Sequence, residues 1–235
     1  MKIIKNCFWA LIPARSGSKK IKNKNLLKLN GKPLIAHSIK TANSIKKIDQ
    51  VFFSSDSLKY LKIAKKYGCK NLVLRKKTLS KDRSTDFDVF KDFVDNIFLY
   101  KKSLPEYIIH LRPTTPIRKN KIIIKAINCM LKNKNYSSLR SVSLMTNPSY
   151  KTFRIKRGKL CSIIKEDYSL DKYNLPKEFF ENTYLPNGYV DIIKTNNIKK
   201  DFMHGNKVYP FIVKEFNSDI DDYKDYISVK KNIND

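Results

Sequence analysis

Phe8-Trp9-Ala10-Leu11-Ile12 runs directly into Pro13-Ala14-Arg15-Ser16-Gly17-Ser18-Lys19, and this stretch decides how the chain can fold. Its apolar half has the length and composition of a buried strand, which Pro13 ends because proline has no backbone N–H. The turn that follows sets a glycine and two serines between Arg15 and Lys19. Such a turn can point backbone amides at an anion while the cations neutralise it. On composition alone it is equally compatible with a solvated basic loop, and it matches neither the Walker A pattern nor the dinucleotide fingerprint.

Strand-like and helical patterns alternate through the first half of the chain. Strands are expected at residues 8–12, 51–53, 72–74 and 107–111, and helices at residues 34–45, 58–67, 90–97 and 123–130. This alternation predicts an α/β fold with a doubly wound, mostly parallel, Rossmann-like sheet. In such sheets ligands bind beyond the carboxyl ends of the strands. The loops after these four strands are therefore the expected binding surface.

The pattern changes at about Ser138. Short β-like pieces are expected at residues 139–144, 152–155 and 160–164, and they lead into a polar, aromatic stretch that ends at Tyr184. We interpret residues 138–184 as an excursion within a single domain of residues 1–235. Strands at 189–193 and 208–213 and a helix at 223–233 return to the sheet.

The composition predicts a soluble protein located in the cytoplasm. A hydrophobic share of 41% can build a core, and no apolar run approaches the roughly 20 residues that span a bilayer. The stretch from Ile3 to Ala14 is interrupted by Lys5 and Asn6 and lacks the apolar core of a signal peptide. The four cysteines are scattered, as reduced thiols would be, and the three histidines are too dispersed to suggest a metal site.

The formal net charge of +28 allows two interpretations. It can mark a nucleic-acid-binding surface, or it can reflect a genome bias that favours lysine, asparagine and isoleucine. The even spread of lysines along the chain favours the second, so no nucleic-acid partner is expected. Arginine is scarce by comparison, and Arg15, Arg75, Arg112 and Arg118 all fall in or beside the expected binding loops. A planar guanidinium suits bidentate contact with phosphate or carboxylate.

Several short motifs, in order along the chain, resemble the acylneuraminate cytidylyltransferases, the CMP-sialic acid synthetase family. They are I-P-A-R-S-G-S-K at residues 12–19, Lys24-Asn25, Gly31-Lys32-Pro33-Leu34, Ser54-Ser55-Asp56, residues 75–86, residues 112–118, Pro186-Asn187-Gly188 and Ser218-Asp219-Ile220-Asp221. One match would be weak, but their common order is specific. The resemblance implies a sheet of the nucleotide-diphospho-sugar transferase type, with a small protruding element that forms a homodimer.

The resemblance also implies a reaction. The anomeric hydroxyl of an acidic nonulosonate sugar would attack the α-phosphorus of CTP, releasing pyrophosphate and leaving a CMP-sugar, with Mg²⁺ as cofactor. Arg15 and Lys19 would act on the triphosphate during catalysis. The full set expected to bind the nucleotide is Ala14, Arg15, Ser18, Lys19, Lys24, Asn25, Arg75, Ser84 and Thr85.

Asp219 and Asp221 are the expected metal ligands. Two residues apart on a strand, they would face the same side, and paired carboxylates suit Mg²⁺ that keeps several waters. The alternative is that Asp219, Asp221 and Asp222 cap the last helix, and capping by Asp222 is compatible with metal binding.

Arg112, Lys151, Asn187 and Asp191 are the expected sugar-binding residues. In this half the chain departs from the family pattern, because Arg112 replaces the common glutamine and Tyr189-Val190-Asp191 replaces A-I-Y. These departures favour a substrate such as legionaminate or pseudaminate over N-acetylneuraminate. In the first loop, Lys20 stands where glycine is usual, which makes the path to Lys24 and Asn25 harder to predict.

Two other functions remain open at this point. The first is a related nucleotidyltransferase that acts on Kdo or a sugar phosphate, against which the P-N-G turn and paired aspartates argue. The second is a basic nucleic-acid-binding protein. The sequence does not settle the sugar, the number of metal ions or the order of binding.

Overall fold

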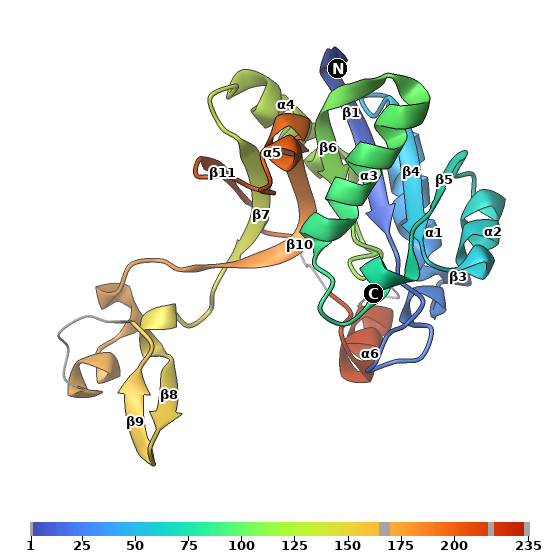
Figure 1. Cartoon of the computed structure of the whole chain (residues 1–235). Coiled ribbons are helices and arrows are strands. Elements are labelled where there is room, and N and C mark those ends of the chain that lie inside the picture. Colours follow the sequence, from blue (N-terminus) through green and yellow to red (C-terminus); the bar gives the residue numbers. More distant parts are fainter. Residues whose placement is uncertain (1, 165–169, 216–218, 233–235) are drawn as a thin grey trace.

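A seven-stranded sheet forms the centre of the molecule, in the order β11-β7-β10-β6-β1-β4-β5 (Figure 1). The computed structural model describes residues 2–164, 170–215 and 219–232. The strand bounds are Lys2–Pro13 (β1), Gln50–Ser55 (β4), Asn71–Leu74 (β5), Ser103–His110 (β6), Ser138–Leu144 (β7), Tyr184–Lys194 (β10) and Val208–Ile212 (β11). β10 runs antiparallel to β6 and β7, and the other strand pairs are parallel. The predicted mostly parallel, Rossmann-like sheet is confirmed.

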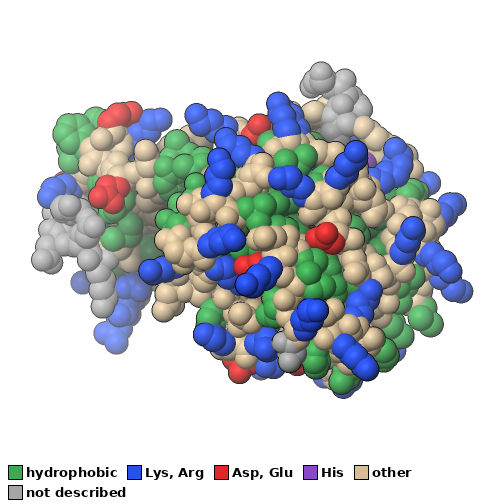
Figure 2. All heavy atoms as spheres, turned by 90° about the horizontal axis from the view of Figure 1, so that it is seen from above, with side chains coloured by type: hydrophobic (Ala, Val, Ile, Leu, Met, Phe, Trp, Pro, Cys, Tyr) green, Lys and Arg blue, Asp and Glu red, His purple; other side chains and the backbone are tan. Residues whose placement is uncertain are grey.

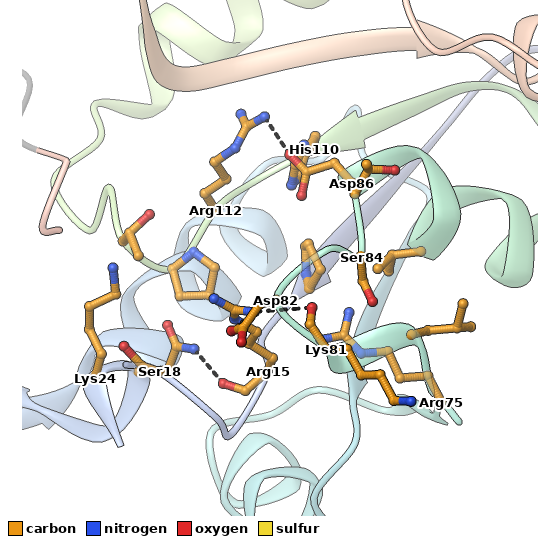
Figure 3. A pocket seen from close by; sticks show the side chains of 17 residues that line it. Arg15, Ser18, Lys24, Arg75, Lys81, Asp82, Ser84, Asp86, His110 and Arg112 are labelled. Atoms are coloured by element: carbon orange, nitrogen blue, oxygen red, sulfur yellow. Dashed lines mark hydrogen bonds and ion pairs between the residues drawn. The ribbon is translucent and has the colours of Figure 1, made fainter. Parts of the chain in front are cut away.

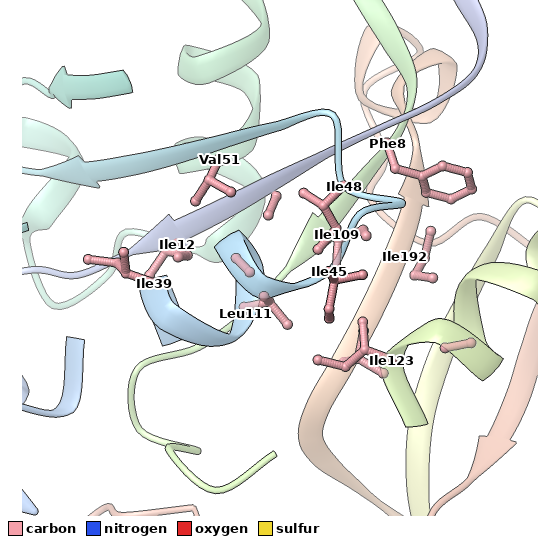
Figure 4. Close-up of a cluster of buried hydrophobic side chains, with 14 of the residues drawn as sticks. Phe8, Ile12, Ile39, Ile45, Ile48, Val51, Ile109, Leu111, Ile123 and Ile192 are labelled. Carbon is pink, nitrogen blue, oxygen red and sulfur yellow. The ribbon is translucent and has the colours of Figure 1, made fainter. Parts of the chain in front are cut away.

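Helices cover both faces of this sheet. α1 (Leu34–Ser44), α2 (Leu58–Lys66) and α4 (Asn120–Lys132) pack on one face, while α3 (Asp86–Lys101) and α5 (Thr195–Lys199) pack on the other. Alternate residues of β1 point to opposite faces, so Phe8, Ala10 and Ile12 join the larger core, shown in Figure 4. Trp9 and Leu11 join the second core beneath α3. A strand that is apolar on both faces must lie inside a two-sided sheet, which explains the continuous apolar run.

The strand order changes direction beside β1. β4 and β5 follow β1 on one side, and β6, the next parallel strand, pairs with its other edge. This arrangement separates the loops after β1 and β6 and opens a crevice between the carboxyl ends of those strands. The expected binding surface therefore lies at the topological switch point.

The excursion begins later than expected. β7 pairs with both β10 and β11, so residues 138–144 belong to the main sheet and the protruding part starts after Leu144. We call residues 145–164 and 170–183 the arm. It carries the hairpin of β8 (Phe153–Lys156) and β9 (Lys159–Ser162) and the short turns η3 (Ser149–Lys151), η4 (Leu170–Asn174) and η5 (Lys177–Phe179). Figure 1 shows the arm extending away from the sheet. Part of the predicted aromatic stretch, including Tyr168, lies outside the described residues.

The C-terminal segment folds back beneath the first loop. α6 (Tyr223–Lys231) contributes Val229 to a small core with Leu29 and Leu34, close to the hairpin of β2 (Lys28–Leu29) and β3 (Lys32–Pro33). Asp222 accepts hydrogen bonds from the backbone N–H groups of residues 224 and 225 and forms a capping box with Asp225. The expected cap is confirmed. The expected strand at 219–221 is wrong, because these residues form a loop in which Ile220 is buried and donates its N–H to Thr114.

Basic side chains are scattered over the surface. On the face shown in Figure 2, lysine and arginine lie among apolar and polar groups without forming a continuous patch. Within the described residues, no helix has both the length and the apolar character that a membrane span requires.

Candidate functional site

A cavity of about 280 Å³ lies at the carboxyl ends of the parallel strands (Figure 3). The loops after β1, β5 and β6 and the turn η1 (Lys24–Leu26) line it. The predicted residues that it brings together are Arg15, Ser18, Lys24, Asn25, Arg75, Ser84, Thr85 and Arg112. Ala14, Lys19, Lys151, Asn187, Asp191, Asp219 and Asp221 are not among its lining residues.

The first loop is anchored at its start and points its cations towards one carboxylate. Ser16 donates its backbone N–H and its hydroxyl to Asp56, at 2.8 and 2.9 Å, which ties the loop to the end of β4. The guanidinium of Arg15 lies 3.6 Å from Asp82, and Lys19 Nζ lies 2.7 Å from the same carboxylate. Ala14 is buried and donates its N–H to Ser54, so this amide continues the strand pairing and is not directed at the cavity.

Lys24 and Asn25 line the cavity, although Lys20 before them departs from the family pattern. The chain turns at Asn23, whose φ of 55° lies in the left-handed region that asparagine tolerates. Asn25 then donates to the carbonyl of Arg15 at 3.0 Å, while its buried Oδ1 has no hydrogen-bond partner among the described residues. Lys24 Nζ lies 3.1 Å from Asp221. These contacts join the first loop to the C-terminal segment at the cavity wall.

The loop after β5 forms the opposite wall. Arg75 is buried, which lowers the pKa of its guanidinium, and its Nε donates to Ser80 at 2.9 Å. Ser84 donates its hydroxyl to the carbonyl of Thr78 at 3.1 Å. Thr85 caps α3 by exchanging hydrogen bonds with Asp88. The hydroxyls of Ser84 and Thr85 therefore shape this loop through internal contacts, and Arg75 and Lys81 are its cationic side chains at the cavity.

Two of the departures from the family pattern contact each other. Arg112 Nη1 lies 2.8 Å from Asp191, and Arg112 Nη2 lies 2.9 Å from Asp86. Asp191 is 1% exposed, so it does not present an accessible carboxylate to a sugar. Asp191 instead holds the guanidinium of Arg112, which does line the cavity. Nothing in the chain order links positions so far apart, so this contact between Arg112 and Asp191 is not predictable from the sequence.

His110 closes the floor of the cavity between these charges. Its ring is fully buried, lies 5.0 Å from the ring of Phe90, and has no hydrogen-bond partner among the described residues. Burial, with a further contribution from the positive charge of Arg112, lowers the pKa of His110 to about 3. The ring is therefore neutral at physiological pH and leaves the positive charge of Arg112 undiminished.

The pKa of His110 predicts an acid-sensitive fold. The unfolded chain binds a proton below about pH 6.5, whereas folded His110 stays neutral down to about pH 3, so stability is present above pH 6.5 and is lost as the pH falls. Between pH 7 and pH 5 this one group should lower the free energy of unfolding by about 2 kcal/mol. Urea titrations at pH 7 and pH 5 would measure the free energy of unfolding. Its loss between these two pH values should be about 2 kcal/mol smaller in His110→Gln than in the unmodified protein. An NMR titration in which the His110 ring of the unmodified protein protonated near pH 6 would contradict the assignment.

Arg118 is a structural centre behind the cavity. Its largely buried guanidinium donates to the carbonyls of Tyr189 (2.6 Å), Arg112 (2.9 Å) and Gly188 (3.1 Å). Burial lowers its pKa to about 9, which leaves it cationic at neutral pH. One side chain thus joins the loop after β6 to the P-N-G turn.

Both the backbone conformation at position 188 and the atoms around it require a glycine there. Its φ is +66°, and a Cβ at this position would lie 3.0 Å from Thr115 Oγ1 and 3.6 Å from Arg112 Cδ. A glycine is therefore needed where the turn passes close to the loop after β6.

Replacing Gly188 by alanine should lower the free energy of unfolding by about 2 kcal/mol, since backbone strain and a close contact act together. Urea denaturation would measure this change. Gly158→Ala is the matched control, because Gly158 in the β8–β9 hairpin has a φ of +75° but open space around it. Equal losses in the two variants would show that the contact with Thr115 is unimportant.

Asn187 and Lys151 do not reach this cavity. Asn187 donates its side-chain amide to Ser143 at 2.9 Å and accepts from the backbone N–H of Tyr189 at 3.1 Å, so it supports the turn from within. Lys151 belongs to the arm, where its Nζ lies 5.7 Å from the centre of the Phe180 ring. Neither residue is among those that line the cavity with Arg112.

The two expected metal ligands lie at the edge of the site. Asp221 is exposed and pairs with Lys24, while Asp219 Oδ2 would lie 4.0 Å from a Cβ built on Gly188. Within residues 2–164, 170–215 and 219–232, no group of three or more histidine, cysteine, aspartate or glutamate side chains is gathered as a metal site.

Asp82, Asp86 and His110 line the cavity but were not among the predicted site residues. Asp82 and Asp86 both fall inside residues 75–86, one of the motifs that carry the family resemblance, and this was the available signal. His110 gave no such signal, because a histidine at the end of an apolar strand is typical of core positions as well.

The comparisons with known proteins agree with this arrangement. The profile of a family described as cytidylyltransferase matches residues 9–186. An N-acylneuraminate cytidylyltransferase from Escherichia coli O18:K1:H7 is 33% identical over 230 residues, which cover 95% of this chain and 52% of that protein. A pseudaminic acid cytidylyltransferase from Campylobacter jejuni subsp. jejuni serotype O:2 is 33% identical over 125 residues, which cover 53% of each protein.

A solved structure extends the likeness in fold to the whole chain. A CMP:2-keto-3-deoxy-manno-octonic acid synthetase complexed with CTP superposes with a TM-score of 0.68 over 97% of this chain and 98% of that one, at 13% identity. The chain spans about half the length of the N-acylneuraminate cytidylyltransferases that it matches. Since the family profile covers most of the chain and the cavity lies where the matched loops converge, this chain belongs to the cytidylyltransferase family.

Proposed function

We propose that this protein transfers CMP from CTP to the anomeric hydroxyl of an acidic nonulosonate and releases pyrophosphate. The observation that carries the proposal is the convergence of Arg15, Lys24, Arg75 and Arg112, from four separate segments, on one cavity. Both substrates are anionic, and a cavity lined by these four cations and by Lys81 suits them. The N-acylneuraminate and pseudaminic acid cytidylyltransferases among the relatives support this substrate class.

The residues of the first loop would act mainly by neutralising and orienting the triphosphate. In the reaction a bond forms between the anomeric oxygen and the α-phosphorus, the bond from that phosphorus to the bridging oxygen breaks, and the hydroxyl proton is released. Such a transfer depends on in-line placement and on compensation of charge more than on covalent catalysis. Arg15 and Lys19 would neutralise the phosphate oxygens, and the hydroxyl of Ser18 would add a hydrogen bond. Arg75 would face the nucleoside part from the opposite wall.

Arg112 would bind the carboxylate of the sugar, held in place by Asp191. A planar guanidinium can contact one carboxylate with one edge and a second with another. The glutamine that is usual here offers no charge, so the Arg112–Asp191 pair makes this part of the site different from that of the sialic acid branch. We therefore propose a bacterial nonulosonate of the legionaminic or pseudaminic type as the sugar.

We also propose Mg²⁺ as the cofactor, held by Asp219 and Asp221. The fit rests on the donors: two exposed carboxylates flank the buried Ile220 near Lys24 and Gly188, at the edge of the cavity. Carboxylates with waters and phosphate oxygens complete an octahedral magnesium site. When bound, the ion would polarise the phosphate and favour ionisation of the attacking hydroxyl. Lys24 would release Asp221 and turn to the triphosphate.

Asp221→Asn should raise the Mg²⁺ concentration needed for half-maximal rate about tenfold, because one charged ligand is lost. Asp219→Asn should behave alike. Initial rates over a magnesium titration at saturating CTP would measure the effect, with Asp95→Asn, an exposed aspartate on α3 that does not line the cavity, as a control. Full activity of Asp221→Asn at limiting Mg²⁺ would remove Asp221 from the metal site.

The arm is the proposed dimer interface. Exposed apolar side chains on it include Ile155, Leu160 and Phe179, which a second subunit would cover. We propose a homodimer, located in the cytoplasm with the CTP pool and with its cysteines reduced. Light scattering on the purified protein and on the double variant Ile155→Asp, Phe179→Asp would show whether the arm holds two copies together.

Pyrophosphate release from CTP tests the proposed function directly. The purified protein would be incubated with CTP, Mg²⁺ and, in turn, pseudaminate, legionaminate, N-acetylneuraminate and Kdo. Turnover of the first or second is expected. A clear preference for N-acetylneuraminate would overturn the assignment of the sugar, and turnover of Kdo alone would overturn the nonulosonate class. Salt-dependent binding of DNA without any turnover would favour the nucleic-acid interpretation.

A further inference from the structure

One short segment supplies carboxylates to the cations of both halves of the cavity. Asp82 contacts Arg15 and Lys19, which the proposed function assigns to the triphosphate. Asp86, four residues later, contacts Arg112, which it assigns to the sugar carboxylate. Asp82 lies between η2 (Lys77–Ser80) and α3, and Asp86 is the first residue of α3; Figure 3 shows Asp82 directed at Arg15 and Asp86 at Arg112.

Both carboxylates are accessible enough to be exchanged. The side chains of Asp82 and Asp86 are 52% and 46% exposed, whereas Asp191, on the other side of Arg112, is 1% exposed. Ion pairs between exposed groups contribute little free energy, because water and salt screen them. Arg112 therefore has one fixed partner and one replaceable partner, and Arg15 and Lys19 share a replaceable one.

Both groups are anions at neutral pH. The hydrogen bond from Lys19 lowers the pKa of Asp82. Burial acts to raise the pKa of Asp86, but the positive charge of Arg112 and the hydrogen bond that it donates outweigh burial and lower the pKa. Each aspartate thus presents a negative charge to cations that an anionic substrate would contact.

The fold of the segment does not depend on these two side chains. α3 begins at a capping box in which Thr85 and Asp88 exchange their hydrogen bonds, and neither Asp82 nor Asp86 takes part in it. The two aspartates are therefore free to move without uncapping the helix.

We propose that Asp82 and Asp86 are internal competitors for the anionic groups of the two substrates. Asp82 occupies the polyphosphate position on Arg15 and Lys19, and Asp86 occupies the carboxylate position on Arg112. Each is displaced when its substrate enters, and Asp82 returns to its cations as pyrophosphate leaves. The identity of the second ligand rests on the proposed function, whereas the competition at Arg15 and Lys19 requires only a polyphosphate. The two aspartates would thus set the affinities for the two substrates separately.

Single charge-removing variants test this pairing. Asp82→Asn should bind pyrophosphate about fivefold more tightly in calorimetry and lower the KM for CTP by a similar factor, with an unchanged KM for the sugar. Asp86→Asn should lower the KM for the sugar about fivefold, with an unchanged KM for CTP and an unchanged affinity for pyrophosphate. Asp95→Asn, an exposed charge on α3 away from the cavity, should change none of these values.

The crossed pattern separates competition from a general electrostatic or structural effect. Equal tightening of both substrates by either variant, or by Asp95→Asn, would show only a change in the overall field and would overturn the proposal. Weaker pyrophosphate binding by Asp82→Asn would overturn it as well, since it would make Asp82 a positioning residue. Calorimetry with pyrophosphate needs no turnover. If no nonulosonate reacts, the proposed function fails. The affinity of Asp82→Asn for pyrophosphate then tests the inference by itself.

Discussion

Replacing Arg15 by alanine is expected to lower kcat/KM for CTP about 100-fold. The guanidinium is the cation of the first loop that lines the cavity, where it donates to the carbonyl of Lys81 and lies 3.6 Å from Asp82. A charge-assisted contact to phosphate that strengthens as charge develops is typically worth this much when one donor is removed. Initial rates over a CTP titration at saturating sugar would measure it.

Two companion variants show whether the loss belongs to this position. Arg15→Lys should recover part of the activity, since it keeps the charge but not the fork of donors. Arg83→Ala removes an exposed arginine of the neighbouring loop that does not line the cavity, and its kcat/KM should stay within twofold of the parent. A loss below threefold for Arg15→Ala, in a folded protein, would contradict the triphosphate assignment.

Replacing Arg118 by methionine is expected to lower the free energy of unfolding by about 3 kcal/mol and the Tm by about 9 °C. Two backbone carbonyls, those of Gly188 and Tyr189, lose the donor that Arg118 supplies inside the protein, and the carbonyl of Arg112 loses one of three donors. Unsatisfied buried acceptors cost more than the lost hydrogen bonds themselves. Methionine has a similar length, so most of the space remains filled and the loss reports on the polar contacts.

Thermal and urea denaturation measure this effect, with Arg154→Met as the matched control on the exposed surface of the arm. Arg118→Lys should fall between the two, because one ammonium cannot reach carbonyls on both segments with the same geometry. If Arg118→Met were as stable as Arg154→Met, the guanidinium would not be what joins the loop after β6 to the P-N-G turn.

Arg15 and Arg118 have different roles in this site. Arg15 lines the cavity and should affect rate with little effect on stability. Arg118 lies behind it and should affect stability, with its influence on the sugar side transmitted through the position of Arg112. The contrast follows from burial, since a largely buried cation with four acceptors is part of the fold.

The parallel sheet and the position of the site followed from local patterns. A strand such as 8–12, apolar on both faces, must lie inside a sheet covered by helices, and the alternation of strands with amphipathic helices allows few topologies. Parallel strands bring their carboxyl ends to one edge, so the loops with Arg15, Arg75 and Arg112 could be predicted to meet. The strand at 219–221 failed because a three-residue pattern of alternating polarity also fits a loop with one buried residue, Ile220.

The pairing of charges came from the tertiary structure alone. Arg112 meets Asp191 because β10 lies antiparallel to β6, and it meets Asp86 because α3 begins beside the same strand end. Neither of these two contacts of Arg112 can be predicted from the order of residues along the chain. The boundary of the arm also depended on strand pairing, since β7 has the same local pattern whether it joins the main sheet or leaves it. Local periodicity thus determined which elements form and where their ends gather. Contacts between distant segments decided which carboxylate each arginine contacts, because charges pair by proximity in space and not by proximity along the chain.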